Sequence, residues 1–352
     1  MNNFRHKDVD GRIYRINFKG EGSIDAGGPF RDSLVNIVQE MEDGVIPLLI
    51  KSPNNRNDHG ANRDCFILNP ASKSPAHLEM YKYLGAFIAF GILSKSPVPL
   101  NLAPTVWKQI LGQQLSLADL ESIDAYSSQV LIDLNQYSAA LTDEEFVSTV
   151  DQNFTTVLSN GDEVVLCEGG DERMVQKDSI NEFIALVIKA RSNEANEQNK
   201  AIQDGLNTVF QGQLDLISYL TPAAIEIRAC GEKTISVERL KAITTYPNCG
   251  NDHEIVGRFW RVFEAFTSEE RALYLKFVWG RNRLPIDTTN VRKHELRLMT
   301  NMAETGFPQS HTCFFQLDIP YYRDDEICAK RLITAGELCG GIDTDNNNFA
   351  EE

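Results

Sequence analysis

The sequence predicts a protein of two domains: a long, mostly helical N-terminal part and a smaller C-terminal part that combines helices with a strand. The chain has 352 residues, 42% of them hydrophobic and 24% charged, an ordinary globular balance that is long enough for more than one packed unit. Apolar residues recur at helical spacing along most of the chain. Near residues 240–254 this pattern stops in a run that contains Pro247, Asn248 and Gly250, so we place the domain boundary there.

The first predicted elements are a strand in RIYRINF, a turn at Gly27 and Gly28, and a helix that starts at Pro29. The turn is not a phosphate-binding loop, because neither G-x-x-x-x-G-K nor G-x-G-x-x-G follows. A further helix is predicted for residues 75–94. Its apolar run, LGAFIAFGIL, is about half of the roughly 20 residues that a helix needs to cross a bilayer. We therefore expect a buried helix and no membrane insertion.

Three S/T-x-x-E capping boxes predict further helix starts. They pair Thr142 with Glu145, Ser179 with Glu182, and Thr267 with Glu270. The second box opens a predicted long helix, residues 179–210, which is apolar early and polar midway, as expected for a helix that leaves a core. Residues 140–215 are therefore expected to protrude.

The C-terminal part begins with an amphipathic helix in IVGRFWRVFEAF and a capped helix that ends at Gly280. The run CFFQLDIP predicts a strand with Phe315, Leu317 and Ile319 on one face. A last helix is expected at about residues 324–339. The polar tail IDTDNNNFAEE follows it.

The formal net charge of −16 argues against a nucleic-acid partner, because phosphate binding needs a basic face. One basic stretch, residues 280–297, is an exception. Its cationic residues are Arg281, Arg283, Arg292, Lys293 and Arg297. We interpret it as a solvated charged surface or, alternatively, as a contact site for an acidic partner.

The seven cysteines form an odd, scattered set without a C-x-x-C pair, and the six histidines show no H-x-x-x-H or Cys/His spacing. Neither a disulfide framework nor a metal site is therefore expected. The N-terminus lacks the long apolar segment of a secretory signal. We expect a reducing compartment and a cytoplasmic location, with the nucleus as a second location.

Cys313 differs in its context from Cys65, Cys167 and Cys230, which we interpret as core residues. It follows the polar run PQSHT and precedes an apolar strand, so its thiol is expected to be accessible. A thiolate can attack an activated acyl group. His311 lies two residues earlier, on the same side of an extended segment, and either favours the thiolate or is an ordinary surface histidine. The sequence shows no signature of a cysteine protease.

The segment PQSHTCFFQLDIPYY resembles the active-site segment of HECT-type ubiquitin ligases, in which His-Thr-Cys-Phe precedes a leucine-rich strand. Other stretches match the family in the same order: GSIDAGGPFRDSL, YKYLGAFIAFGILSKSPVPLNLAPTVWKQILG and FWRVFEAFTSEERALYLKFVWGRNRLP. The resemblance covers almost the whole chain. GANRDCFILNP and FVWGRNRLP are most similar to the large HERC-type members.

The resemblance implies an α+β, bilobal fold. Its parts are an N-lobe at 1–244 with a protruding conjugating-enzyme-binding subdomain at about 140–215, a hinge at 245–251, and a C-lobe at 252–352. Cys313 takes the position of the catalytic cysteine, supported by His311 and Thr312. The residues expected to contact the conjugating enzyme are Leu216, Tyr219 and Leu220. Those expected to form the hinge are Pro247, Asn248 and Gly250.

The resemblance also implies an activity that needs no cofactor. Ubiquitin would arrive as a thioester on a conjugating enzyme, transfer to Cys313 and pass to a lysine of a protein substrate. The family's C-terminal phenylalanine corresponds to either Phe349 or Ile342. The alternatives are a catalytically weak module that binds the conjugating enzyme or ubiquitin, and a cysteine hydrolase that acts on ubiquitin-like substrates.

Overall fold

In a computed structural model of the chain, the structure describes residues 28–94, 97–212, 219–285, 292–300, 302 and 305–338. These residues fall into two compact units. The first unit consists of Gln39–Ala89 and Leu100–Glu226, and the second of residues 28–38, Phe90–Pro99 and the described residues from Ile227 onward. Helices with small sheets confirm the predicted α+β class. No helix in the described ranges is long and apolar enough to span a bilayer.

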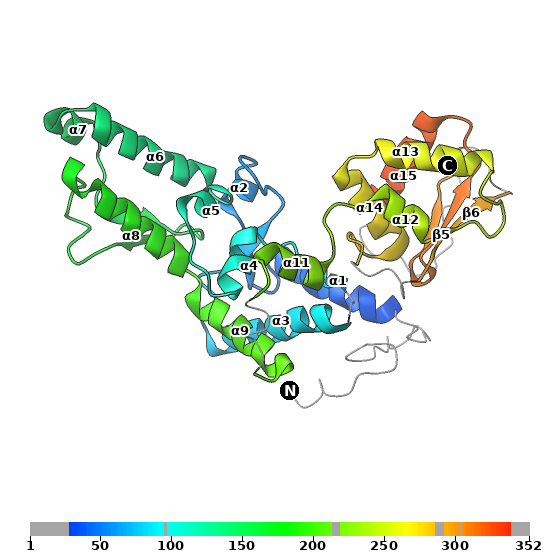
Figure 1. The fold of residues 1–352 in the computed structure, drawn as a ribbon, viewed down its shortest axis with the longest axis horizontal. Coiled ribbons are helices and arrows are strands. Elements are labelled where there is room, and N and C mark those ends of the chain that lie inside the picture. The colour runs from blue at the N-terminus through cyan, green and yellow to red at the C-terminus, as the bar shows by residue number, and fades with distance from the viewer. Residues whose placement is uncertain are drawn as a thin grey trace. The chain divides into compact units, whose positions relative to one another are not determined.

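The elements up to residue 230 are mainly helical (Figure 1). The helices are α1 (Gly28–Glu42), α2 (Pro53–Arg56), α3 (Pro75–Ser94), α4 (Pro104–Ile110), α5 (Leu117–Glu121), α6 (Ala125–Ala140), α7 (Asp143–Thr149), α8 (Ile180–Asn193), α9 (Asn196–Phe210) and α11 (Pro222–Cys230), with the 3-10 turn η2 at Lys177–Ser179. Two antiparallel strand pairs accompany them: β1 (Leu49–Lys51) with β2 (Phe66–Leu68), and β3 (Thr155–Val157) with β4 (Glu163–Val165). The helix predicted at residues 75–94 is confirmed as α3.

Within the first unit, α3 and α9 approach each other closely at two glycines. A Cβ on Gly85 would lie 2.1 Å from the carbonyl oxygen of Ile202, and a Cβ on Gly205 would lie 1.9 Å from that of Lys82. Real Cβ atoms do not approach backbone oxygen so closely, so both positions require glycine at this helix separation.

The segment from α6 to α8 has a small core of its own. Figure 1 shows α6 and α8 side by side, and the two helices are in contact. The buried residues of this core are Leu131, Leu134, Phe146, Val150, Phe154, Val175, Ile180, Phe183 and Val187. The capping box of Thr142 with Glu145 is confirmed at the start of α7.

The predicted long helix at residues 179–210 is wrong, because the chain breaks between α8 and α9. Ala195 has non-helical angles, φ −120° and ψ 30°, which separate the two helices. The predicted box at Ser179 is also wrong. The Ser179 hydroxyl accepts from the Gln176 amide at 2.9 Å, while Glu182 pairs with Arg173 at 2.6 Å.

A buried ionic cluster holds α8 against the start of α6. Arg191 is 3% exposed, and its guanidinium lies 2.8 Å from Asp124 and 3.3 Å from Glu194. Asp124 also caps α6 by accepting from the Ser127 amide. The Ser159 hydroxyl accepts from Arg191 at 2.9 Å. Arg191 is thus shared between two carboxylates, and each of these buried charges has a partner of opposite sign.

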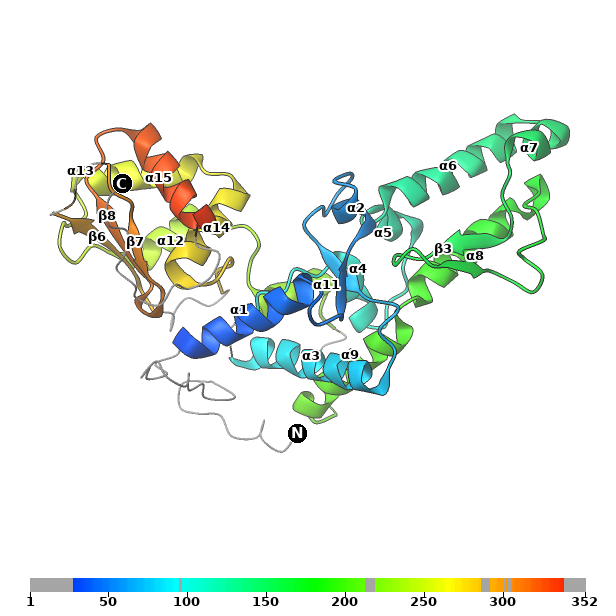
Figure 2. The same ribbon diagram turned by 180° about the vertical axis from the view of Figure 1, so that it is seen from behind.

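The C-terminal part of the second unit surrounds a mixed sheet of order β5-β6-β8-β7. The strands are β5 (Thr244–Thr245), β6 (His294–Met299), β7 (Gln309–His311) and β8 (Gln316–Pro320), and the helices are α12 (Val237–Ala242), α13 (Glu254–Ala265), α14 (Ser268–Trp279) and α15 (Asp325–Leu338), with the 3-10 turn η3 at Thr312–Phe314. β5, β6 and β8 are parallel, and β7 is antiparallel to β8. Figure 2 shows α14 and α15 beside these strands, and α14 contacts both β7 and η3.

Several predictions for this region are confirmed. Thr267 and Glu270 form the capping box of α14, and the helix ends at Gly280 in the left-handed conformation, φ 68°. Phe315, Leu317 and Ile319 are all fully buried. The last helix is observed at Asp325–Leu338, against the predicted 324–339.

Residues 245–251, the predicted hinge, fall within the second unit. Ile235 and Leu240, which precede it, belong to the same hydrophobic core as α13 and β8. Asn248 binds the backbone of β6: its side-chain amide donates to the Leu298 carbonyl and its side-chain oxygen accepts from the Leu298 amide, each at 2.9 Å. The turn that contains Pro247, Asn248 and Gly250 is therefore hydrogen-bonded to the sheet through Asn248. Its polar composition is also typical of a linker, which is why the sequence pattern indicated a boundary here.

Candidate functional site

Cys313 lies in a tight connection between two paired strands. β7 ends at His311, the 3-10 turn η3 covers Thr312–Phe314, and β8 begins at Gln316. The sequence pattern predicted an extended segment from His311 through Cys313. The structure differs, because the chain leaves the strand at Thr312 and turns. The Cys313 side chain lies outside the part of the chain that the structure describes, so the accessibility of its thiol stays a prediction.

Phe315 anchors the end of this turn. Its backbone has φ 51° and ψ 48°, a left-handed conformation that is uncommon for a bulky residue. Its fully buried ring stacks on Trp279, with ring centroids 4.3 Å apart and planes inclined by 8°. The Phe315 amide donates to the Thr312 carbonyl, and its carbonyl accepts from the Glu295 amide at 2.9 Å. Ring burial thus stabilises a strained backbone two residues beyond Cys313.

His294 lies next to this anchor, with its ring centroid 4.9 Å from that of Phe315. Burial lowers the pKa of His294 to about 3, so the ring is neutral. The Thr244 hydroxyl donates to the Leu240 carbonyl, so it accepts from His294 Nδ1 at 2.9 Å. His294 Nε2 then accepts from the Tyr274 hydroxyl at 2.9 Å, and burial raises the pKa of that hydroxyl well above its usual value.

Asp318 orients His311. Nε2 of His311 lies 3.3 Å from Oδ2 of Asp318, and the Gln316 side chain donates to Oδ1 at 2.7 Å. The two partners meet because the register places Gln309 opposite Asp318, which makes His311 a diagonal neighbour of Asp318. Sequence reasoning missed Asp318. The sequence did indicate a tight turn between two short strands. The pairing register of β7 with β8 was needed to identify Asp318 as the partner of His311.

Four of the other described cysteines are poorer nucleophile candidates: Cys65, Cys230, Cys249 and Cys328. Cys65 and Cys230 are fully buried, as predicted. Burial raises the pKa of the Cys328 thiol to about 12 and also raises the pKa of Cys249. Cys167 is only partly buried, and its sulfur accepts from the Arg173 guanidinium at 3.8 Å.

Of the residues predicted to contact the conjugating enzyme, Tyr219 and Leu220 belong to the first unit, whereas Cys313 belongs to the second. Leu216 lies outside the described residues. The Tyr219 side chain is 86% exposed, and Leu220 is half-buried. Phe349 and Ile342 also lie outside the described residues.

The basic stretch is not a uniform solvated surface. Arg283 is buried, at 4% exposure. Arg281 and Arg292 each cover an aromatic ring, those of Trp279 and Phe314 respectively. Two guanidinium groups of this stretch therefore pack on aromatic rings of α14 and η3, the elements next to Cys313.

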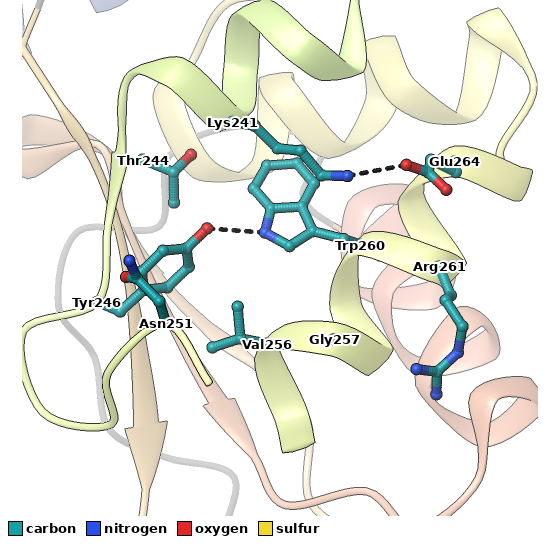
Figure 3. A pocket seen from close by; sticks show the side chains of 9 residues that line it. All are labelled: Lys241, Thr244, Tyr246, Asn251, Val256, Gly257, Trp260, Arg261 and Glu264. Atoms are coloured by element: carbon teal, nitrogen blue, oxygen red, sulfur yellow. Dashed lines mark hydrogen bonds and ion pairs between the residues drawn. The ribbon is translucent and has the colours of Figure 1, made fainter. Parts of the chain in front are cut away.

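A pocket of about 610 Å³ opens at the opposite edge of the sheet, beside β5 and α13 (Figure 3). Its lining residues are Lys241, Thr244, Tyr246, Asn251, Val256, Gly257, Trp260, Arg261 and Glu264. Several of its polar groups pair with one another or with neighbours. Trp260 donates to the Tyr246 hydroxyl at 2.8 Å, and Lys241 lies 2.8 Å from Glu264. Because β5 and β7 are opposite edge strands, this pocket is separate from the turn that carries Cys313.

Within the described ranges, no group of three or more His, Cys, Asp or Glu side chains is placed to hold a metal ion. A family model described as HECT-domain (ubiquitin-transferase) matches residues 36–344. The E3 ubiquitin-protein ligase HERC2 of Mus musculus is 35% identical over 95% of this chain, and that of Homo sapiens is 34% identical over 95%. The E3 ubiquitin-protein ligase TOM1 of Saccharomyces cerevisiae is 28% identical over 91%. The chain spans 7% of each HERC2 protein and 10% of TOM1.

Proposed function

This chain belongs to the HECT-domain (ubiquitin-transferase) family, and on this premise we propose that it accepts ubiquitin from a conjugating enzyme on Cys313 and passes it to a lysine of a protein substrate. The observation that carries the proposal is the His-Thr-Cys-Phe segment in a turn whose far end is anchored by buried Phe315. The relatives named as E3 ubiquitin-protein ligases support the same reaction.

The proposed reaction is a pair of acyl transfers. The Cys313 thiolate attacks the carbonyl carbon of the ubiquitin thioester, a new C–S bond forms, and the conjugating-enzyme thiolate leaves. A substrate lysine amine then attacks the Cys313 thioester. The C–N bond forms, Cys313 leaves as a thiolate, and the amine proton passes to a base or to water. One thioester replaces another in the first step, so that step needs no nucleotide.

His311 and Asp318 support this chemistry through their geometry. The Asp318 carboxylate limits the orientation of the His311 ring, two residues before Cys313. An imidazole held in this way is suited to accept a proton from the thiol or from the attacking amine. The conjugating enzyme is proposed to bind the first unit at Tyr219 and Leu220, and the exposed Tyr219 ring is the feature that supports this assignment.

The deciding experiment mixes a ubiquitin-charged conjugating enzyme with this chain and separates the products on a non-reducing gel. We expect a thiol-sensitive adduct. Cys313→Ser should abolish it, or replace it with a thiol-resistant oxyester, because a hydroxyl is far less ionised than a thiol. Cys249→Ser is the matched control, since Cys249 is in the same unit and partly buried. An undiminished adduct in Cys313→Ser would contradict the assignment.

The same assay separates the two alternatives. A binding module would retain the charged conjugating enzyme on a column without forming an adduct. A hydrolase would release free ubiquitin from a linear ubiquitin fusion without any conjugating enzyme. Either result in the wild-type chain would replace the transferase proposal.

A further inference from the structure

The pocket beside β5 and α13 is not used by the proposed transfer reaction. Its volume of about 610 Å³ lies in the range of ligand-binding pockets. In Figure 3, Tyr246 and Asn251 lie at one end of the pocket and Arg261 at the other, with Trp260 between them. All of the residues that line the pocket belong to the second unit, so its geometry is set within a single compact unit.

Gly257 leaves one side of the pocket open. It lies inside α13, where glycine weakens a helix relative to alanine. A Cβ atom at this position would meet only Nη1 of Arg261, at 3.6 Å, so packing within the protein does not require glycine here. Glycine does allow a ligand to approach the backbone closely. Gly257 thus leaves room for a ligand to contact α13.

Arg261 directs part of its guanidinium group to the Gly257 side of the pocket. Its Nε and Nη2 atoms each lie 2.9 Å from an oxygen of Asp325, which holds the group in one orientation. The third nitrogen, Nη1, is the atom nearest to Gly257. Within the described residues, Nη1 donates to no acceptor. Arg261 therefore offers the pocket a fixed cationic donor.

Lys241 and Tyr246 provide further donors around the Trp260 ring. The Lys241 ammonium group lies 5.2 Å from the centre of that ring and donates to Glu264 at 2.8 Å, which leaves two of its three N–H groups. The Tyr246 hydroxyl accepts from Trp260 at 2.8 Å, so its own proton remains a donor. Among the lining residues, Glu264 is the one carboxylate. The pocket is thus richer in donors than in acceptors.

We propose that this pocket binds an acidic group, a carboxylate or a phosphate, on an extended segment of a partner protein. Such a group accepts charge-assisted hydrogen bonds, and Arg261, Lys241 and Tyr246 can donate them from three sides. Buried Val256 and the Trp260 ring offer apolar contact to the neighbouring atoms of the segment.

The position of the pocket at a sheet edge favours an extended segment. β5 is an edge strand, and the Ile243 carbonyl accepts from the His294 amide of β6. In a parallel ladder this bond directs the N–H and C=O groups of the next residue, Thr244, away from β6. Thr244 also lines the pocket. Its backbone groups can therefore pair with an added chain, as edge strands commonly do.

Glu264 competes with the acidic group for Lys241. The two side chains are 39% and 53% exposed, and ion pairs at such exposure contribute little to stability. An incoming anion can therefore replace Glu264 at small cost. Asp325 does not compete in the same way, because it binds Arg258 as well as Arg261 and does not line the pocket.

The test measures the binding of labelled peptides to the complete chain by fluorescence anisotropy. Three ten-residue peptides of threonine and valine differ only at two central positions, which hold glutamate, phosphoserine or glutamine. We expect the glutamate or the phosphoserine peptide to bind at least about tenfold more tightly than the glutamine peptide. The tighter of the two acidic peptides identifies the carboxylate or the phosphate as the preferred group.

The variants of the ion pair are expected to act in opposite directions. Lys241→Gln should weaken binding of the acidic peptide about fivefold, because it removes a cationic donor. Glu264→Gln should tighten it about twofold, because it removes the competing carboxylate. Gly257→Leu should weaken it about tenfold or more by filling the open side, and leucine suits a helix, so the melting temperature should not fall.

Lys330→Gln is the matched control, since Lys330 is an exposed lysine of α15 that does not line the pocket. Its affinity for the acidic peptide should remain within about twofold of wild type. Failure of both acidic peptides to bind, equal binding of the glutamine peptide, equal weakening in Lys330→Gln, or weaker binding in Glu264→Gln would each overturn the inference. Cys313→Ser should bind the peptide as tightly as wild type, so the result does not depend on ubiquitin transfer.

Discussion

The rings of Phe315 and Trp279 stack almost in parallel, and this contact ties the turn at Cys313 to the end of α14. It holds Phe315 in a left-handed backbone conformation that a bulky side chain seldom adopts. The geometry of the turn therefore depends on burial of a residue that follows it, in addition to the residues of the turn itself.

Phe315→Ala is expected to lower the free energy of unfolding by about 3 to 5 kcal/mol, the usual cost of removing a buried aromatic ring. Phe314→Ala is the matched control: the neighbouring ring is 52% exposed, so its loss should cost about 1 kcal/mol or less. Urea unfolding monitored by tryptophan fluorescence measures both. Equal losses in the two variants would show that the stacking on Trp279 does not stabilise the turn.

Stability is expected to fall as the pH is lowered from 7.5 to 5.5, because burial lowers the pKa of His294 to about 3. The unfolded chain, with a histidine pKa near 6.5, binds this proton in the window between the two values while the folded chain does not, so stability rises with pH there. The contribution of His294 at pH 5.5 is a loss of about 1.4 kcal/mol.

His294→Gln should be less stable at pH 7.5 but should lose this part of the pH dependence. His59→Gln, at an exposed histidine, should keep it. Denaturant midpoints at the two pH values provide the comparison. A pH dependence that persists in His294→Gln would assign it to other groups.

Gly85→Ala is expected to destabilise the first unit by about 1 to 3 kcal/mol or more, because the added Cβ would lie 2.1 Å from the Ile202 carbonyl oxygen and must push α3 and α9 apart. Gly257→Ala is the opposite case. It is also within a helix, its nearest neighbour is the Arg261 side chain at 3.6 Å, and alanine should stabilise α13 by about 0.5 to 1 kcal/mol. Thermal unfolding should therefore show shifts of opposite sign.

Asn248→Ala is expected to cost about 1 to 2 kcal/mol, because it removes two hydrogen bonds to the Leu298 backbone. Amide hydrogen exchange should accelerate at Leu298 in particular. Asn251→Ala, an exposed asparagine in the same turn, serves as the control. Slower ubiquitin transfer in Asn248→Ala without faster exchange at Leu298 would instead favour the hinge predicted at 245–251.

Tyr219→Ala is expected to weaken conjugating-enzyme binding by about 1 to 2 kcal/mol and to leave the melting temperature nearly unchanged, because the side chain is 86% exposed. Binding is measured by titration with a ubiquitin-conjugating enzyme. Tyr126→Ala, at a tyrosine that is 58% exposed on α6, is the control for loss of a surface ring. Unaltered affinity in Tyr219→Ala would place the contact elsewhere.

The sequence by itself determined the local elements and the family. Spacing and capping chemistry predicted α3, the starts of α7 and α14, and the end of α14 at Gly280, because these features depend on residues within a few positions of one another. The His-Thr-Cys-Phe segment and the stretches around it identified the HECT-type family and singled out Cys313, and the family match confirms that resemblance.

Only the tertiary structure decided which distant residues surround that turn. Three such residues are distant from Cys313 in the chain: Trp279 by 34 positions, His294 by 19 and Arg292 by 21. Sheet order and helix packing bring Trp279 and His294 to the Phe315 ring and Arg292 to the Phe314 ring. The division of the chain also needed the structure. Residues 245–251 have the composition of a linker, yet their hydrogen bonds run to β6, and a sequence pattern does not specify the partner of a backbone group across fifty residues.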